Sequence, residues 1–201
     1  MRAAKRPSLV IAGVVCQTLI EKEYSIVNIQ KQLKYYIENI PKGIAGFRAT
    51  FVDLSHFDFY DHGEDLNTTF KLECKCGSGD SKILMQFYPD DGILSDPIFI
   101  QCESCGKKLL LFDSRFHGYD GELGHNDGEP DQKEDLKLYK CSKCNDSLME
   151  ILVRFEYPDD LFDEYFDDFR GREQDLFSWF TILGVCQKCG EFQYINDFEC
   201  A

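Results

Sequence analysis

The apolar residues follow a helical spacing near the start of the chain and the spacing of strands further along. After Ser25, which can serve as an N-cap, apolar side chains recur every three or four residues until Pro41. They are Ile26, Ile29, Leu33, Tyr36, Ile37 and Ile40. This spacing predicts an amphipathic helix, whereas the later stretches "FRATFVDLSHF" and "TTFKLEC" predict strands. We therefore expect one helix followed by a mainly β body.

A pattern of strand, turn and paired cysteines occurs twice in that β body. The stretch "KLECKCGSGDSKILMQFYPDD" corresponds to "KLYKCSKCNDSLMEILVRFEYPDD", and "IFIQCESCGKKLLLFD" corresponds to "TILGVCQKCGEFQYIND". In the second copy, apolar residues alternate with mostly polar ones from Met149 to Tyr157, as in a strand with one buried face. The matching strands, turns and cysteines predict an internal duplication.

Eight of the ten cysteines form four close pairs within the repeat. The pairs are Cys74/Cys76, Cys102/Cys105, Cys141/Cys144 and Cys186/Cys189, while Cys16 and Cys200 stand alone. Close pairs indicate thiolate metal sites in a reducing compartment, because secreted disulfide frameworks usually scatter their cysteines. We expect a cytoplasmic protein that holds two structural Zn²⁺ ions, with cysteine thiolates as the ligands.

Each copy is expected to close one tetrahedral site from its own two pairs. Cys74, Cys76, Cys102 and Cys105 would bind the first ion, and Cys141, Cys144, Cys186 and Cys189 the second. Three alternatives are pairs from different copies that share an ion, dithiol redox switches, and an iron–sulfur cluster. The one-residue gap between Cys74 and Cys76 departs from the two-residue gap of the other pairs.

The segments "CESCG" and "CQKCG" look like the knuckles of the zinc-ribbon superfamily. The arrangement of the pairs also has a weak similarity to the eukaryotic CXXC-motif zinc-binding proteins. The resemblance covers residues 68–113 and 136–198. It implies zinc and β-structure, and it carries over no activity to this chain. The expected fold is therefore mainly β (α+β), with two tandem zinc-ribbon-like modules and an N-terminal amphipathic helix.

Composition and repeat together divide the chain into four parts. We expect an N-terminal helical segment at 1–46, a first module at 47–116, an acidic Gly-rich linker at 117–135 and a second module at 136–201. The second module contains an insertion at 159–170, where apolar residues from Leu161 to Phe169 fall at helical spacing among acidic ones. This insertion predicts a short acidic helix.

The net charge of −14 restricts the partners that the protein can bind. Such a charge repels phosphate backbones and favours a basic protein partner. The stretch "YPDDLFDEYFDDF" combines aromatic rings with acidic side chains, which is typical of a surface that binds a basic partner. The expected contact residues are Asp160, Asp163, Glu164, Asp167 and Asp168. No apolar stretch approaches the roughly 20 residues of a membrane-spanning helix.

These observations favour a non-enzymatic, zinc-stabilised acidic protein, such as an immunity protein or inhibitor that neutralises a basic partner like a nuclease. One alternative is a zinc-ribbon adaptor that associates with nucleic acid through the basic N-terminal segment. Another is a metal-dependent enzyme with a site near His117 and Asp120, where His125 and Asp127 also lie. The chain has no Gly-rich phosphate loop and no GxSxG motif, so a binding protein is preferred over an enzyme.

Overall fold

The computed structural model describes residues 29–54, 66–88, 93–125, 136–158, 161 and 168–200. A helix occupies residues 29–38 and is followed by a short 3-10 helix, η1 (Lys42–Ile44). The ring of Tyr36 in this helix is fully buried and stacks on Tyr157, with 3.7 Å between ring centroids. The N-terminal helix predicted from the apolar spacing is thus confirmed, while its predicted start at Ser25 lies outside the described residues.

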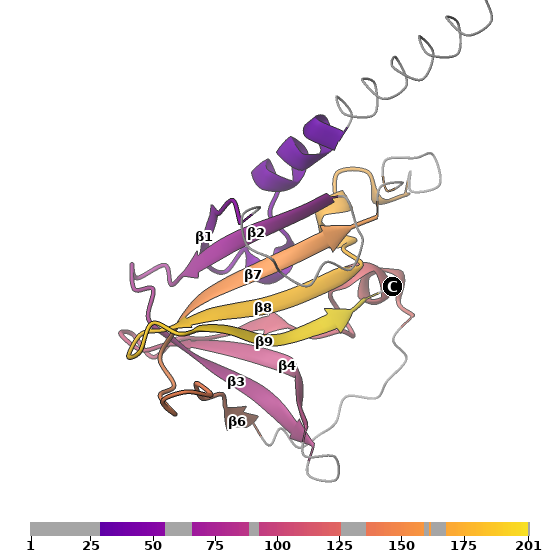
Figure 1. Ribbon diagram of the computed structural model, residues 1–201. Coiled ribbons are helices and arrows are strands. Elements are labelled where there is room, and N and C mark those ends of the chain that lie inside the picture. The colour runs from indigo at the N-terminus through magenta and orange to yellow at the C-terminus, as the bar shows by residue number, and fades with distance from the viewer. Residues whose placement is uncertain are drawn as a thin grey trace, which may run out of the picture.

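Nine antiparallel strands form most of the regular structure in the rest of the described chain (Figure 1), as expected for a mainly β fold. Their bounds are β1 (Arg48–Phe51), β2 (Leu66–Glu73), β3 (Ser81–Tyr88), β4 (Ile93–Cys102), β5 (Lys108–Phe112), β6 (Leu136–Leu138), β7 (Met149–Tyr157), β8 (Trp179–Cys186) and β9 (Phe192–Glu199).

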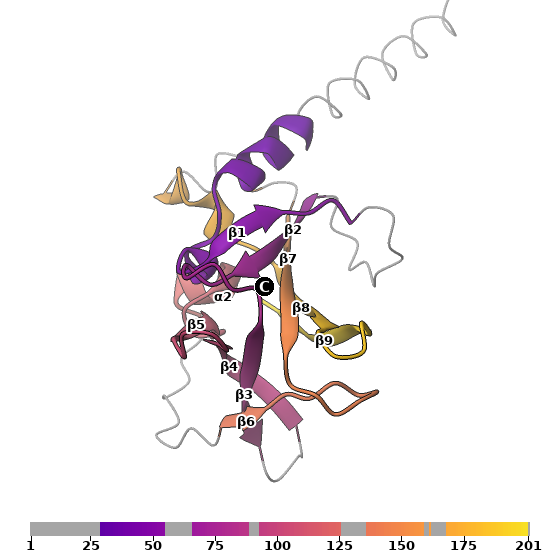
Figure 2. The same cartoon turned by 90° about the vertical axis from the view of Figure 1, so that its left-hand side faces the viewer.

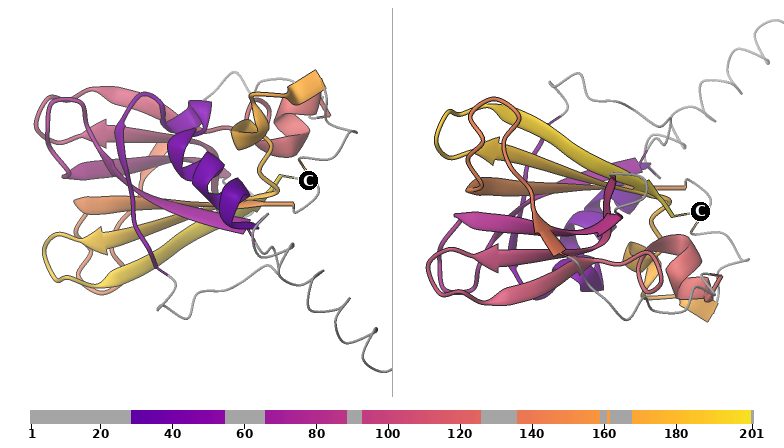
Figure 3. Two further views of the ribbon diagram at one scale, coloured as in Figure 1. Left: turned by 90° about the horizontal axis from the view of Figure 1, so that it is seen from above. Right: turned by 90° about the horizontal axis from the view of Figure 1, so that it is seen from below.

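The strands form one curled sheet with two halves. One half runs β1-β2-β7-β8-β9, and the other runs β6-β3-β4-β5. The halves are joined where Ser81 of β3 pairs with Met149 of β7. Figure 2 and Figure 3 show them as two layers that face each other. Apolar side chains fill the space between the layers; for example, Phe112 of β5 stacks on Phe180 of β8 with 4.5 Å between ring centroids.

The two copies of the repeat exchange their first strands. By position in the repeat, β2 corresponds to β6, β3 to β7, β4 to β8 and β5 to β9. Within each copy the last three strands pair in chain order, β3-β4-β5 and β7-β8-β9. The first strand pairs across to the other copy, because β2 lies beside β7 and β6 lies beside β3. The copies therefore build one body together.

The two copies share features of strand register, which supports the internal duplication. They also differ, because the β3–β4 ladder shifts between Met85 and Gln86 and the equivalent β7–β8 ladder does not. Ser81 pairs with Cys102 in the first copy, and at the equivalent place Met149 pairs with Cys186 in the second. The β4–β5 ladder has an irregularity between residues 98 and 99, and the β8–β9 ladder has one between the equivalent residues 182 and 183. Because a bulge is a specific local feature of a strand pair, its repetition indicates a common origin.

The predicted linker at 117–135 contains a short helix, α2 (Gly118–Leu123). Its backbone is tied to the second copy, since Tyr119 N–H donates to Phe177 O and Asp120 N–H donates to Cys200 O. A further 3-10 turn, η3 (Glu173–Asp175), lies near α2. The acidic helix predicted at 159–170 lies mostly outside the described residues. No helix in the described part of the chain is long and apolar enough to cross a membrane.

Candidate metal centres

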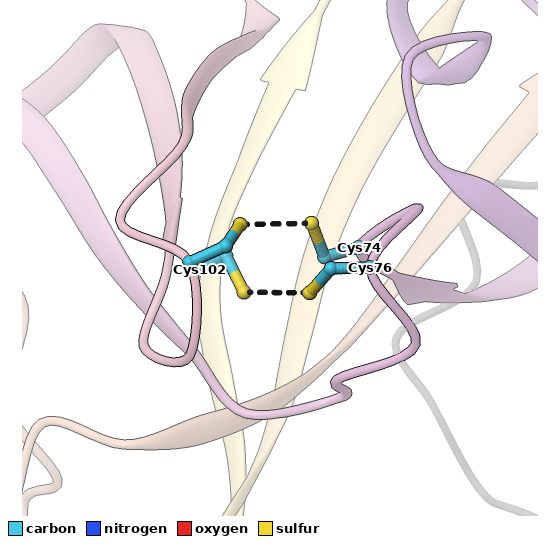
Figure 4. Close-up of side chains that lie close together, drawn as sticks. Cys74, Cys76 and Cys102 are labelled. Atoms are coloured by element: carbon cyan, nitrogen blue, oxygen red, sulfur yellow. Dashed lines mark hydrogen bonds between the residues drawn. The ribbon is translucent and has the colours of Figure 1, made fainter.

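Four cysteine side chains from each copy converge on one point. Cluster A consists of Cys74, Cys76, Cys102 and Cys105, and cluster B consists of Cys141, Cys144, Cys186 and Cys189. Within each cluster all sulfur atoms lie within 4.8 Å of one another. Figure 4 shows Cys74 and Cys76 of cluster A facing Cys102 from the opposite knuckle. The structure therefore confirms that each cluster takes its four cysteines from one copy. It rules out the alternative in which cysteines from different copies share an ion.

The sulfur separations suit a tetrahedral metal ion. They are 3.6 Å for Cys74–Cys105 and Cys76–Cys102 in cluster A. In cluster B they are 3.7 Å for Cys141–Cys189 and 3.5 Å for Cys144–Cys186. A Zn–S bond of about 2.3 Å gives a tetrahedron with edges of about 3.8 Å, whereas a disulfide would need about 2.05 Å. Each cluster can thus hold one ion such as Zn²⁺ with four thiolates.

All four knuckles use the same backbone turn to aim their cysteines. The carbonyl of the first cysteine accepts the N–H of a residue just after the second, namely Gly77, Gly106, Asn145 or Gly190. The N–H of the first cysteine donates to the carbonyl of the next residue along, namely Ser78, Lys107, Asp146 or Glu191. In the Cys74–Cys76 knuckle this turn closes one residue earlier than in the others. The unusual spacing there is therefore a shortened form of the same turn.

The residue after each second cysteine has a left-handed backbone. The φ angles are 97° at Gly77, 72° at Gly106, 61° at Asn145 and 70° at Gly190. Glycine adopts this region freely and asparagine is the residue that replaces it most readily. The sequence suggested this role for the Gly of "CESCG" and "CQKCG", but not for Asn145. Alignment of the two copies could have revealed the role of Asn145, because it stands where the other knuckles have glycine.

Backbone N–H groups and neighbouring sulfurs divide each cluster into unlike thiols. Burial raises the pKa of Cys102, but the N–H of Cys105 and the Cys76 sulfur outweigh it and lower the pKa to about 7. The N–H of Cys189 lowers the pKa of Cys186, also to about 7. The N–H of Ser78 lowers the pKa of Cys76, but the surrounding thiols outweigh it and raise the pKa to about 11.

Four thiolates so close together repel one another, so full ionisation needs a cation at the centre. A divalent ion would supply that charge. It would bind as the thiols release their protons. With four protein ligands a tetrahedral Zn²⁺ has no open position for a substrate, and such sites are structural. The donor set therefore fits an ion that stabilises the fold.

Both clusters lie at the same end of the two layers, because β3 and β7 begin just after their knuckles and pair through their first residues, Ser81 and Met149. Each knuckle connects two strand ends there: the first pair of knuckles joins β2 to β3 and β4 to β5, and the second joins β6 to β7 and β8 to β9. The helix α2, the η3 turn and the end of β9 lie at the opposite end (Figure 1). The molecule thus has a knuckle end and a far end.

The histidines that sequence analysis offered for an enzyme site lie apart from the clusters. His117 is buried, and its Nδ1 accepts the N–H of Asp113 at 3.0 Å, which places the ring proton on Nε2. His125 pairs with Asp120 at 3.2 Å on the surface. His56, His62 and Asp127 lie outside the described residues. In the described part of the chain, clusters A and B are the groups of three or more His, Cys, Asp or Glu side chains that could hold an ion.

Three partly buried polar contacts that the sequence did not reveal secure the far end. The Tyr35 hydroxyl donates to Glu173 Oε2 at 2.5 Å, and the N–H of Lys42 donates to Asp175 Oδ1 at 2.7 Å. Glu122 of α2 forms an ion pair with Lys42. Periodicity could not find these contacts, because each joins residues that are far apart in the chain. They attach the N-terminal segment to the second copy and to α2.

Comparisons with known proteins give no relative for this chain: no family model matches it, and neither does any curated protein or any solved structure.

Proposed function

We propose that the protein is a non-enzymatic binding protein, in which two zinc ions hold the knuckle end and the far end binds a basic protein partner. The closed donor sets of clusters A and B support a structural role for the ions. The positions of the acidic segments in the fold support a basic partner. An immunity protein or inhibitor, which covers a basic surface of its target, is the kind of protein that this combination suits best.

The observation that carries the proposal is the distribution of acidic residues over the connections between strands. Segments 55–65, 89–92, 126–135 and 159–167 contain 16 Asp or Glu and 1 Lys. They connect β1 to β2, β3 to β4, α2 to β6 and β7 to β8. The described residues alone carry 18 Asp or Glu against 17 Lys or Arg, so the charge of −14 comes almost entirely from elsewhere.

All four acidic connections are attached at the far end. β2 runs toward its knuckle, so its first residue, Leu66, lies at the far end, where it pairs with Tyr157, the last residue of β7. The end of β3 pairs with the start of β4 through Tyr88 and Ile93. β6 begins beside Gln86, near the same end of β3. The topology therefore anchors 16 acidic residues around one end of the molecule, which gives a field that would steer a basic partner.

The segment at 159–167 is the proposed centre of the contact, since it combines acidic residues with aromatic ones. Asp168, the described member of the predicted contact set, is exposed. Asp160, Asp163, Glu164 and Asp167 complete that set. In such interfaces the aromatic rings supply most of the affinity, while the charges raise the association rate.

A zero-length carbodiimide cross-link between carboxylates and lysines tests the proposal directly. The tagged full chain is expressed in its own host, treated with the reagent in the lysate and purified. We expect one basic protein to be joined to carboxylates of segments 55–65, 89–92, 126–135 or 159–167. Native mass spectrometry of the untreated complex should then show two zinc ions and this partner, with dissociation as salt is raised.

A charge-matched pair of variants provides the control. The first changes Asp160, Asp163 and Asp167 to Asn, and the second changes Glu73, Asp80 and Glu103, at the knuckle end, to Gln or Asn. Only the first should slow association with the identified partner. Cross-links that map to the knuckle end, or a partner that is itself acidic, would contradict the proposal.

A further inference from the structure

The duplication supplies two metal clusters with the same ligands in the same fold, so differences between them are informative. In cluster A the second cysteine of each knuckle, Cys76 and Cys105, is exposed. In cluster B the residue equivalent to Cys76 is Cys144, which is half-buried. The first cysteine of every knuckle is buried in both clusters. One edge of cluster A is thus open to solvent, and the equivalent edge of cluster B is partly covered.

Contacts between the two knuckles of cluster B hold that site closed. Lys143 Nζ lies 2.6 Å from Glu191 Oε2, and Lys188 Nζ lies 3.9 Å from Asp146 Oδ2. Gln193 Oε1 also accepts from both the N–H and the hydroxyl of Ser142, at 3.1 and 2.9 Å. All three contacts cross from the knuckle between β6 and β7 to the knuckle between β8 and β9, and all would be lost if the knuckles separated.

The residues of cluster A at the same positions cannot make these contacts. Lys107 stands where cluster B has Glu191, and the single residue between Cys74 and Cys76 is Lys75, so two lysines replace the first ion pair. Ser78 and Ser104 replace the second ion pair, and Leu109 replaces Gln193.

Lys75 is held away from the other knuckle of cluster A. Its Nζ donates to Ala45 O at 3.0 Å, in the segment that follows η1. Its own carbonyl accepts from Arg48 at 3.3 Å. The Cys74–Cys76 knuckle is therefore tied to the N-terminal part of the chain, whereas the cluster B knuckles are tied to each other by side chains.

We infer that cluster A is an exchangeable metal site, which passes its ion to and receives it from soluble thiol or chelating ligands, while cluster B keeps its ion. In the exchange an incoming ligand binds the zinc at the edge formed by Cys76 and Cys105. One Zn–S bond breaks as each new bond to the ion forms, and each released thiolate takes a proton from water. No electron is transferred, so no oxidant is required.

The test compares the two sites within one molecule. The full chain loaded with two zinc ions is mixed with the chromogenic chelator 4-(2-pyridylazo)resorcinol, and zinc release is followed over time. Native mass spectrometry of quenched samples counts the ions that remain. Because two exposed ion pairs and a shared acceptor are together worth about a factor of ten, one ion should leave at least about tenfold faster than the other.

Cysteine labelling assigns the faster ion to its site. After release of one equivalent of zinc, N-ethylmaleimide should modify the cluster A cysteines, led by Cys76 and Cys105, and leave Cys144 and Cys189 unmodified. Labelling of cluster B first, or loss of both ions at a single rate, would overturn the inference. This measurement uses the unaltered protein and so does not depend on whether a variant folds.

Two reciprocal substitutions test the physical cause. Lys107→Glu gives Lys75 an acidic neighbour and should slow release from cluster A, while Glu191→Lys removes the Lys143 ion pair and should speed release from cluster B. Rates that change in neither variant would show that the cross-knuckle contacts do not control exchange. None of these readouts depends on the partner proposed above, so the two proposals can fail separately.

Discussion

At the scale of single residues, the left-handed position after each second cysteine is a requirement that recurs in all four knuckles. Gly106 and Gly190 occupy it with φ near 70°, and a Cβ at either position would meet no atom within 4 Å. Replacing either glycine therefore destabilises the protein only through the strained left-handed backbone, and not through a steric clash. Asn145 shows that the position tolerates a side chain whose polar group can bond locally.

Gly190→Ala should lower the free energy of unfolding of the zinc-loaded protein by about 1 kcal/mol, the cost of a left-handed alanine. Urea titration at fixed free zinc measures the change. Gly79→Ala is the matched control, because a Cβ there also meets nothing within 4 Å and no positive φ is required. Equal losses in the two variants would show that the left-handed backbone is not the cause.

His117 should make stability depend on pH. Burial and the nearby Lys42 lower the pKa of His117 below its ordinary value of 6.5, so the folded protein keeps this ring neutral. As the pH falls through about 6.5 the unfolded chain takes up a proton that the folded chain does not, and the free energy of unfolding decreases.

The comparison with His117→Asn isolates this effect, since asparagine can still accept the N–H of Asp113 and the metal clusters are unchanged. Denaturation between pH 7.5 and 5.5 should show a steeper loss for the native protein than for the variant. Parallel curves would mean that His117 does not titrate in this way.

The sequence identified all eight cysteines of clusters A and B and their grouping, because paired cysteines in a repeated pattern are typical of a metal site. It did not identify the tyrosine and carboxylate contacts at the far end. Tyr35 and Glu173, for example, meet only because the N-terminal helix packs beside the turn that precedes β8. No local pattern records such a contact.

At the scale of elements, the N-terminal helix is attached through its inner face. The buried Tyr36 ring stacks on Tyr157, the partly buried Ile29 and Leu33 pack against the core, and the Tyr35 hydroxyl donates a hydrogen bond to Glu173. The outer side of the same helix carries the exposed pair Lys34 and Glu38, at 3.7 Å. The helix should therefore separate from the sheet when its inner face is changed and not when its outer face is changed.

Tyr36→Ala should release the helix while the sheet stays folded. Removal of a fully buried aromatic side chain costs about 3 kcal/mol or more. Hydrogen exchange should then show loss of protection at residues 29–38 and retained protection in β7 and β8. Lys34→Ala, the control on the outer face, should leave both patterns unchanged. Simultaneous loss of protection in the strands would show that the helix is part of the cooperative core.

The sequence predicted the existence and type of most elements but not the partners of two strands. Alternation of apolar and polar residues predicts which face of β2 or β6 is buried. It does not predict which strand pairs with β2 or β6. The choice is made by tertiary packing, which explains why tandem modules were expected and one shared body is found.

At the scale of the whole molecule, the exchange of β2 and β6 makes the two copies depend on each other. β2 supplies seven residue pairs to β7, from Leu66–Tyr157 to Leu72–Ile151, and β6 supplies three to β3. A copy taken alone keeps its four cysteines but loses the partner of its first strand. Zinc binding and folding should therefore be separable by cutting the chain.

Fragments 66–116 and 136–200 provide the test. Each should bind zinc, yet neither should give a folded monomer, and mixing them with zinc should restore the dispersed NMR spectrum of the whole body. The intact chain cut by a protease within segment 126–135 is the control, because it retains both copies. A folded monomeric fragment would instead make each copy an independent domain.

The exchanged strands also bear on the evolutionary origin of the protein. Ser81 and Met149, the residues at which the two halves meet, occupy equivalent positions, so the copies are related by a two-fold axis that passes close to this pair. A symmetric homodimer of one copy would have this geometry, with the first strand of each chain donated to the other. Gene duplication and fusion of such a dimer would link its two chains through the region between α2 and β6. The present protein is then a covalent dimer, in which each former subunit became free to change its metal site and its loops independently.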